Sequence, residues 1–257
     1  MNVVVAGGGT IAPIDDIRMI ANVSSGRFAA TITEACLERG ASVRHIHTPS
    51  ALLPFERSAR FDLDAENVAE EHRRLDHLAE EWRKYRARLR LVPLAAGTVW
   101  DYARTLESIL KSEKIDVVFL AIAVSDYEPE AHHSGKIGSD DESLLIRCRR
   151  TPKIIRSVRD WSPSTYLAGF KLLSRAGEAE LISEARRACE TNRADLTIAN
   201  DLQSVREGRH TIHLVRPEHP PETLGPAPDL AAKLVDRVFT WAKGQVPGEP
   251  DHSRMNR

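Results

Sequence analysis

The sequence predicts an α/β fold: a Rossmann-like, mostly parallel sheet with helices on both faces, a helical insertion and a small β lip. Short apolar runs, typical of strands buried on both faces, alternate along the chain with amphipathic segments of helical period. The first run, residues 3–6, ends at Gly7-Gly8-Gly9. A helical segment over 27–39, closed by Gly40, and a second strand over 42–47 complete a strand–helix–strand unit.

The alternation continues through the rest of the chain. Residues 64–88 are highly charged with an apolar stripe at helical spacing, which predicts a helical insertion at the surface. Residues 1–243 should form one domain, and we expect 244–257 to be a disordered tail. The stripe comprises Val68, Leu75, Leu78, Trp82 and Tyr85; further strands are expected at 89–93, 115–121, 143–148, 165–170, 196–199 and 211–215, and further helices at 99–111, 152–161 (capped by Thr151), 178–192 and 230–241.

Composition excludes several classes of protein. The 257 residues include 36 basic and 37 acidic side chains, so there is no overall positive field to hold a nucleic-acid backbone. The longest apolar run, near residues 115–124, is too short to cross a bilayer, and residues 1–5 lack the basic region of a signal peptide. The 3 cysteines have no CxxC spacing, which favours reduced thiols. We therefore expect a cytoplasmic globular protein that binds neither nucleic acid nor membrane.

The candidate site lies in loops 7–27, 122–141, 170–176 and 200–209, because ligands of parallel sheets bind beyond the carboxyl ends of the strands. Gly7, Gly9 and Ala12 partly match a dinucleotide fingerprint, which leaves an NAD(P)-dependent oxidoreductase as one alternative. The match is weak. The helix starts only near Ser24, and no acidic residue follows the second strand to bind a ribose.

An anion-binding turn is the more specific feature of the first loop. Residues 22–27 read Asn-Val-Ser-Ser-Gly-Arg at the start of a predicted helix. Unpaired backbone N–H groups at a helix N-terminus suit a phosphate or carboxylate, and Arg27 would add positive charge. An ordinary serine N-cap on a surface helix is the alternative interpretation.

Polar and aromatic side chains also follow three later strands. Asp126 comes just after the strand at 115–121, with Lys136 ten residues further on; a surface ion pair is the alternative. Phe170-Lys171 and Asn200-Asp201 end two further strands, where a core ring and a simple turn are the alternatives. The histidines at 45, 47, 132 and 133 lack companion ligands at metal-binding spacing, so we expect no protein metal site.

Taken together, these motifs resemble the phosphopantothenoylcysteine synthetase family of coenzyme A biosynthesis, in order from about residue 3 to residue 240. The resemblance implies a ligase that activates the carboxylate of phosphopantothenate with ATP or CTP and Mg²⁺, releases pyrophosphate, and joins the acyl group to cysteine. The matching segments are Ala6-Gly7-Gly8-Gly9-Thr10, Pro13-Ile14-Asp15, Arg18 to Gly26, Ala123 to Tyr127, Lys136-Ile137, Gly169-Phe170-Lys171 and Ala194 to Asp201.

The resemblance also implies a role for each motif. Asn22 would hold the substrate carboxylate and its acyl-nucleotidylate, and Lys136 would neutralise the triphosphate as charge develops. Asp126 would bind the base and ribose, and Phe170 would line the base pocket. The expected phosphate contacts are Ser24, Ser25, Gly26 and Arg27, and the remaining nucleotide contacts are Gly8, Gly9, Thr10, Ala121, Ile122, Ala123 and Lys171.

Some positions depart from the pattern of the bacterial bifunctional members. Lys136 is followed by Ile137-Gly138-Ser139 instead of further lysines, so Lys171 or Arg27 would have to substitute. Together with the insertion at 64–88 and Phe170-Lys171-Leu172-Leu173, this favours a monofunctional protein nearer the eukaryotic-type synthetases, and ATP over CTP. No decarboxylase module is expected before residue 1. Ala29 replaces a usual glycine, which questions a close approach at that helix.

Family members are dimers with a shared active site, so the resemblance implies a homodimer with residues 122–141 as the contact region. A non-catalytic nucleotide-binding protein with the same fold is a further alternative.

Overall fold

The computed structural model describes residues 1–245 and is built around an eight-stranded sheet in the order β12-β11-β10-β9-β6-β1-β4-β5. The strands from β10 to β5 in this order pair in parallel, and β11 and β12 extend one edge antiparallel. The predicted fold class is therefore confirmed. The strands are β1 (Asn2–Gly7), β4 (Ser42–His47), β5 (Leu89–Pro93), β6 (Val117–Leu120), β9 (Tyr166–Leu173), β10 (Leu196–Asp201), β11 (Ile212–Val215) and β12 (Glu222–Leu224).

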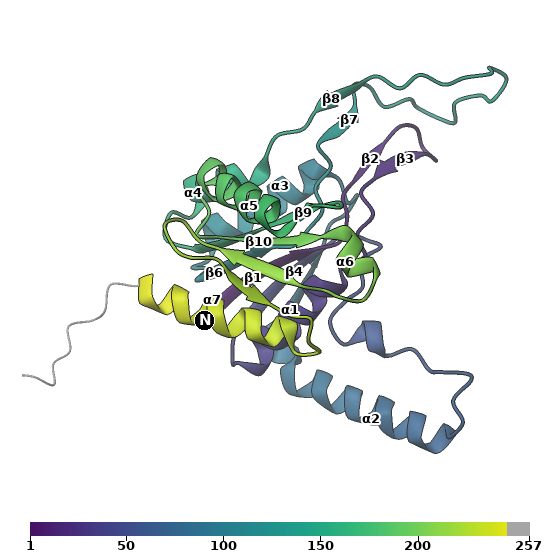
Figure 1. The fold of residues 1–257 in the computed structure, drawn as a ribbon. Helices are drawn as coiled ribbons and strands as arrows, with labels where there is room; N and C mark the ends of the chain where they lie inside the picture. The colour runs from purple at the N-terminus through teal and green to yellow at the C-terminus, as the bar shows by residue number, and fades with distance from the viewer. Residues whose placement is uncertain (246–257) are drawn as a thin grey trace, which may run out of the picture.

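Helices cover both faces of this sheet (Figure 1). One face packs against α1 (Arg27–Glu38) and α7 (Leu230–Gln245), and the other against α3 (Val99–Ser112), α4 (Val158–Trp161) and α5 (Glu178–Asn192). Consecutive residues of β1 alternate between the two cores: Val3 and Val5 pack with the α1 side, and Val4 and Ala6 with the α3 side. A strand buried on both faces needs an unbroken apolar run, which is why β1 could be predicted.

The helical insertion is shorter than predicted. α2 (Val68–Tyr85) begins at Val68 because Asn67 caps it, accepting a hydrogen bond from the Glu70 N–H at 3.1 Å, and residues 86–88 form a separate 3₁₀ turn, η2. The C-terminal half of α2 packs against the core, whereas Val68 is 55% exposed. The predicted apolar stripe is thus buried at one end only, and α2 projects from the body of the molecule (Figure 1).

Two small hairpins project beyond the sheet (Figure 1). β2 (Ile11–Pro13) pairs with β3 (Met19–Ala21), and β7 (Tyr127–Pro129) pairs with β8 (Cys148–Arg150). The predicted strand at 143–148 is wrong, since only Cys148 belongs to a strand. Leu144 and Leu145 form an apolar run, but they are 52% and 93% exposed and lie outside the hydrophobic cores, so the run has no core to cover.

Other element boundaries also need correction. The predicted helix at 152–161 is a 3₁₀ turn, η3 (Ile154–Ser157), followed by α4, and Thr151 is not its cap because its hydroxyl donates to the Ser125 carbonyl at 2.6 Å. α6 (Leu202–Arg206), η1 (Glu56–Ser58) and β12 were not predicted. α7 continues two residues into the predicted tail, and the rest of that tail lies outside the described residues. No helix within residues 1–245 is both long and apolar enough to span a membrane.

Candidate active site

The glycine turn after β1 is fastened to the segment after β6. The Ala123 N–H donates to the Gly8 carbonyl, and the Thr10 N–H donates to the Ala123 carbonyl, both at 2.9 Å. The Thr10 hydroxyl in turn accepts from the Ser125 N–H at 2.8 Å. Two segments that lie more than a hundred residues apart in the chain therefore form one continuous edge, as expected from the carboxyl ends of neighbouring parallel strands.

The 22–26 turn packs directly on the same glycines. Gly8 has a φ of 95°, and a Cβ atom on Gly9 would lie 2.1 Å from the Asn22 carbonyl oxygen. A Cβ atom on Gly26 would lie 3.1 Å from the Gly8 nitrogen. Only glycine permits these approaches, because any side chain would push the two turns apart. Asn22 is thereby held over the glycine turn, with its backbone N–H donating to the Thr10 carbonyl at 3.3 Å.

The N-terminus of α1 is left open by the same turn. Its N-cap is Gly26, with a φ of 71° and no side-chain cap, so the alternative of an ordinary serine cap is wrong. Ser25 and Arg27 are exposed, and the Ser25 hydroxyl accepts a long bond of 3.4 Å from the Arg27 N–H. Backbone donors at such an end favour an anion.

Ala29 does not prevent a close approach between α1 and β1. A Cβ atom on Gly7 would lie 2.4 Å from the Ala29 Cβ atom. The close approach of helix and strand is therefore retained, with the glycine on the strand side of the contact.

Lys136 and Asp126 do not pair with each other. Asp126 forms its ion pair with Lys153. Lys136 is exposed and belongs to the loop between β7 and β8, where that loop lies against the tip of the β2–β3 hairpin. The flanking residues of Lys136 are held there: the Gly135 N–H donates to the Asp16 carboxylate at 2.9 Å, and the Ile137 N–H donates to Asp15 at 3.1 Å. The alternative of an Asp126–Lys136 surface pair is wrong.

Asp15 organises this tip, a role that no motif in the sequence indicated. The whole residue is 2% exposed. Its carboxylate accepts from the Ile17 N–H at 2.9 Å, the Arg18 N–H at 2.6 Å and the Arg18 guanidinium at 2.7 Å. Burial alone would raise the pKa of Asp15, but these donors and the Ile137 N–H outweigh burial and hold it well below the usual range. The Asp-x-x-Arg spacing was the only signal for this turn in the sequence.

An aromatic cluster of Phe28, Phe170 and His210 lies at the carboxyl ends of β9 and β10, beside the N-terminus of α1. Phe170 is half-buried against the core, and its ring meets that of Phe28 edge to face at 6.1 Å. Phe28 in turn meets His210 at 4.7 Å. Lys171 was a candidate to replace the further lysines that are absent after Lys136. In this structure its ammonium instead lies 3.6 Å from the Glu184 carboxylate on α5.

Asp201 serves the turn that follows β10. It caps α6 by accepting from the Ser204 N–H at 3.0 Å and also accepts from the Ala176 N–H at 3.2 Å. These backbone donors, the Ser204 N–H first, lower the pKa of Asp201 despite its burial. The turn interpretation thus holds for Asp201, whereas the amide nitrogen of Asn200 faces His210.

The histidine pair of β4 is packed beneath the glycine turn. His45 is fully buried with its Nδ1 2.7 Å from the Thr33 hydroxyl, and His47 has its Nδ1 3.1 Å from the Thr48 carbonyl. Burial and the neighbouring His47 lower the pKa of His45 to about 3. Within residues 1–245, no three ligand-type side chains gather as a metal centre would require.

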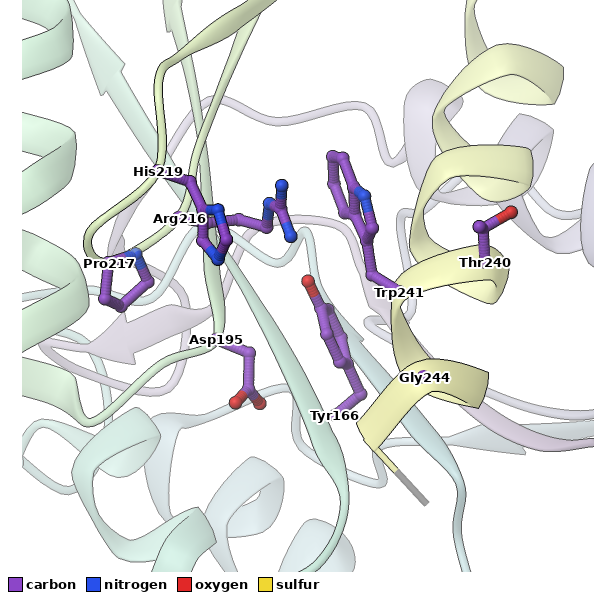
Figure 2. A pocket seen from close by; sticks show the side chains of 8 residues that line it. All are labelled: Tyr166, Asp195, Arg216, Pro217, His219, Thr240, Trp241 and Gly244. Carbon is purple, nitrogen blue, oxygen red and sulfur yellow. The ribbon is translucent and has the colours of Figure 1, made fainter. Parts of the chain in front are cut away.

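A pocket with an aromatic wall lies elsewhere, at the opposite edge of the sheet. Figure 2 shows the Tyr166, Arg216 and Trp241 side chains facing one another across a pocket of about 420 Å³, with the Arg216 guanidinium 4.1 Å from the Trp241 ring centroid. Tyr166 begins β9 and Arg216 follows the antiparallel β11, so this pocket lies at the amino edge of the parallel strands. It contains none of the predicted site residues.

Residues 1–79 and 98–240 match the model of the DNA/pantothenate metabolism flavoprotein C-terminal domain. The chain belongs to this family. The chain is 34% identical over 213 residues to the coenzyme A biosynthesis bifunctional protein CoaBC of Thermococcus kodakarensis, covering 83% of this chain and 44% of the relative. It is 29% identical to the human phosphopantothenate–cysteine ligase, covering 79% of this chain and 72% of the relative.

Solved structures agree on the fold. A histidine-to-alanine variant of Cab2, in complex with phosphopantothenate-cysteine, superposes with a TM-score of 0.83 at 23% identity, covering 95% of this chain and 87% of that chain. The DNA/pantothenate metabolism flavoprotein from Streptococcus pneumoniae superposes with a TM-score of 0.73 at 25% identity, covering 95% of this chain and 99% of that chain. The chain thus spans less than half of the bifunctional relative and most of each of these structures.

Proposed function

We propose that the chain is a phosphopantothenate–cysteine ligase, acting through an acyl-nucleotidylate made from ATP or CTP with release of pyrophosphate. The observation that carries this proposal is the interlocked edge of the sheet. The glycine turn, the Asn22 turn and the Ala121–Ser125 segment lie together, in a chain whose family includes proteins named for this reaction. Small-molecule substrates and a cytoplasmic location follow from the proposal.

The first half-reaction joins two anions, a carboxylate and the α-phosphate of the nucleotide. Asn22, held over Gly9, would orient the carboxylate, and the open N-terminus of α1 with Arg27 would receive the phosphate of phosphopantothenate. Lys136 would offset the charge that develops on the triphosphate. Asp126 and Ala121 to Ala123 would hold the base and ribose, with Phe170 lining the pocket.

Magnesium would supply charge neutralisation to the triphosphate. Mg²⁺ in such sites is held largely by phosphate oxygens and water, with one or two carboxylates. We therefore propose that the ion enters with the nucleotide.

We further propose a homodimer with a shared site. Lys136 lies at the hairpin tip of its own chain, while Asn22 lies at the hairpin base, next to the Ala21–Ile11 pair. The hairpins and the turn that follows β3 also expose large apolar side chains, which are unfavourable in water. These are Ile17, Met19, Val23, Leu144 and Leu145.

We also propose that the protein is monofunctional and prefers ATP, as in the eukaryotic-type synthetases. The single lysine at 136 and the projecting α2 insertion support this placement. The two proposals are independent of each other. The preferred nucleotide is identified by comparing the rates of pyrophosphate release with ATP and with CTP.

The test is pyrophosphate release in the presence of Mg²⁺ and phosphopantothenate, with ATP and CTP in parallel and cysteine added last. The proposal requires release that depends on phosphopantothenate and turns over with cysteine. Lys136→Gln should abolish turnover while the fold is retained, and unchanged activity would remove Lys136 from the site. Folded protein that is silent with both nucleotides would favour the non-catalytic nucleotide-binding alternative.

A further inference from the structure

His210 belongs to the aromatic cluster at the carboxyl edge of the sheet but has no part in the roles described above. Its ring centroid lies 4.7 Å from that of Phe28, which in turn lies 6.1 Å from the ring of Phe170. Phe28 directly follows Arg27 in the first turn of α1. His210 therefore lies beside the residue that connects the phosphate-binding turn with the base pocket.

The contacts of the ring fix which nitrogen is the acceptor. The Asn200 amide nitrogen lies 3.5 Å from Nε2 of His210, at the long limit of a hydrogen bond. An amide nitrogen can only donate, so Nε2 is the unprotonated ring nitrogen in this arrangement, and the contact is long enough for its lone pair to be given up to a stronger donor. Burial lowers the pKa of His210 and so favours the neutral ring, the form that can accept a proton.

The charged groups on the elements around His210 are satisfied elsewhere or open to solvent. Among the described residues 1–245, no carboxylate forms an ion pair with the His210 ring. Arg27 on α1 is exposed, Lys171 on β9 pairs with Glu184, Asp201 on β10 accepts from backbone N–H groups, Arg209 pairs with Glu207, and Asp229 before α7 pairs with Lys233.

We propose that His210 is the proton acceptor of the amide-forming step, an inference that rests on the proposed function. Cysteine arrives as an ammonium ion, which has no lone pair to attack with. Nε2 of His210 exchanges its long contact with the Asn200 amide for the ammonium group and takes one proton from it. The lone pair freed on the cysteine nitrogen then forms the N–C bond at the acyl carbonyl of the acyl-nucleotidylate. The bond between that carbon and the phosphate oxygen then breaks. The nucleoside monophosphate leaves with the electron pair and with the second proton of the nitrogen.

The experiment separates the two half-reactions in His210→Gln. Glutamine retains a side chain that can bond to Asn200 but accepts no proton near neutral pH. The first half-reaction is measured as exchange of labelled pyrophosphate into the nucleotide with phosphopantothenate alone. The second is measured as a single turnover of preformed acyl-nucleotidylate with cysteine. Exchange should stay within about twofold of wild type, while the second step should slow by about 100-fold at pH 7.

Two further readouts exclude a merely structural role. The wild-type second step should fall at acid pH as His210 is protonated. The rate of the variant should instead rise with pH as cysteine loses its own proton, so that the deficit narrows. Hydroxylamine, which is largely unprotonated at pH 7, should consume the intermediate equally fast in both proteins. His219→Gln, the same change at the opposite edge of the sheet, is the matched control and should behave as wild type.

Three results would overturn the proposal. They are a second step within threefold of wild type, a pH profile that does not change, and an equal loss of both half-reactions in the variant. Failure of the proposed function itself looks different, because wild-type protein would then catalyse no pyrophosphate exchange at all.

Discussion

Single glycines fix the geometry of the candidate site at the residue scale. Gly9→Ala would place a Cβ atom 2.1 Å from the Asn22 carbonyl oxygen, so the 22–26 turn would have to move. We expect a loss of about 1–3 kcal/mol in the free energy of unfolding and at least a tenfold loss in kcat/KM for phosphopantothenate. Thermal unfolding and pyrophosphate release measure the two effects.

Gly244→Ala is the matched control, because a Cβ atom there meets nothing within 4 Å. Alanine in α7 should leave activity unchanged and increase stability slightly. Equal activity of wild type and Gly9→Ala would contradict the tight packing of the two turns.

A second prediction at the residue scale concerns His45 and acid. Its pKa is about 3 in the fold, against about 6.5 when the chain is unfolded, so the unfolded state binds the proton first. The stability that comes from the neutral ring is therefore complete above pH 6.5 and is lost as the pH falls toward 3. The loss should approach about 1.4 kcal/mol per pH unit once the unfolded histidine is protonated.

Urea unfolding at several values between pH 7 and pH 5 measures this slope, in a window above the titration of the carboxylates. His45→Gln should have a shallower slope than wild type, whatever its absolute stability. Identical slopes in the two proteins would show that His45 gains access to water in the fold.

The hairpins carry the prediction at the element scale. Asp15→Asn replaces an acceptor of four hydrogen bonds by a group whose NH₂ end faces other donors. The tip should separate from residues 135–137, so turnover should fall about tenfold through misplacement of Lys136. The melting temperature should change little, since the hairpin lies outside the main cores.

Hydrogen exchange at the backbone amides of Gly135 and Ile137 checks this directly. Both should exchange faster in Asp15→Asn than in wild type. Asp141→Asn, in the same loop and exposed, should exchange as wild type does. Unchanged protection in Asp15→Asn would mean that the tip is held by contacts other than this carboxylate.

The same scale explains which elements the sequence could predict. β1 and β6 are buried on both faces, and each therefore leaves an uninterrupted apolar run. β2 and β3 have only three residues each, too few to show an alternating strand pattern, and β2 also ends in Pro13. The pairing depends on the turn around Asp15 and on residues far along the chain, which no local window contains. Leu144 and Leu145 show the reverse error, an apolar run with no partner.

The candidate site divides in the same way. The rule that ligands bind beyond the carboxyl ends of parallel strands predicts that the Gly7–Gly9 turn, the Asn22 turn and the segment after β6 belong to one site. The structure brings these three segments together. The ion pairs of charged side chains could not be predicted, because their partners come from other segments of the chain. Asp126 pairs with Lys153, and Lys171 pairs with Glu184. His210 carried no signal because its neighbours Phe28 and Phe170 come from elements distant in sequence.

At the scale of the whole molecule, a shared active site predicts complementation between two inactive variants. Asn22→Asp and Lys136→Gln should each be inactive alone, and sedimentation should show that both are dimers. In a dimer of one copy of each, one site takes its intact asparagine from one chain and its intact lysine from the other. The second site carries both defects.

Unfolding and refolding the two variants together would make about half of the dimers mixed, each with one working site, if pairing is random. Pyrophosphate release should then recover to about a quarter of the wild-type rate. A mixture that stays inactive, although mass measurement shows mixed dimers, would place Asn22 and Lys136 in the same chain's site. The hairpin would then have to fold back over its own base, a movement that hydrogen exchange at residues 135–137 on substrate binding would detect.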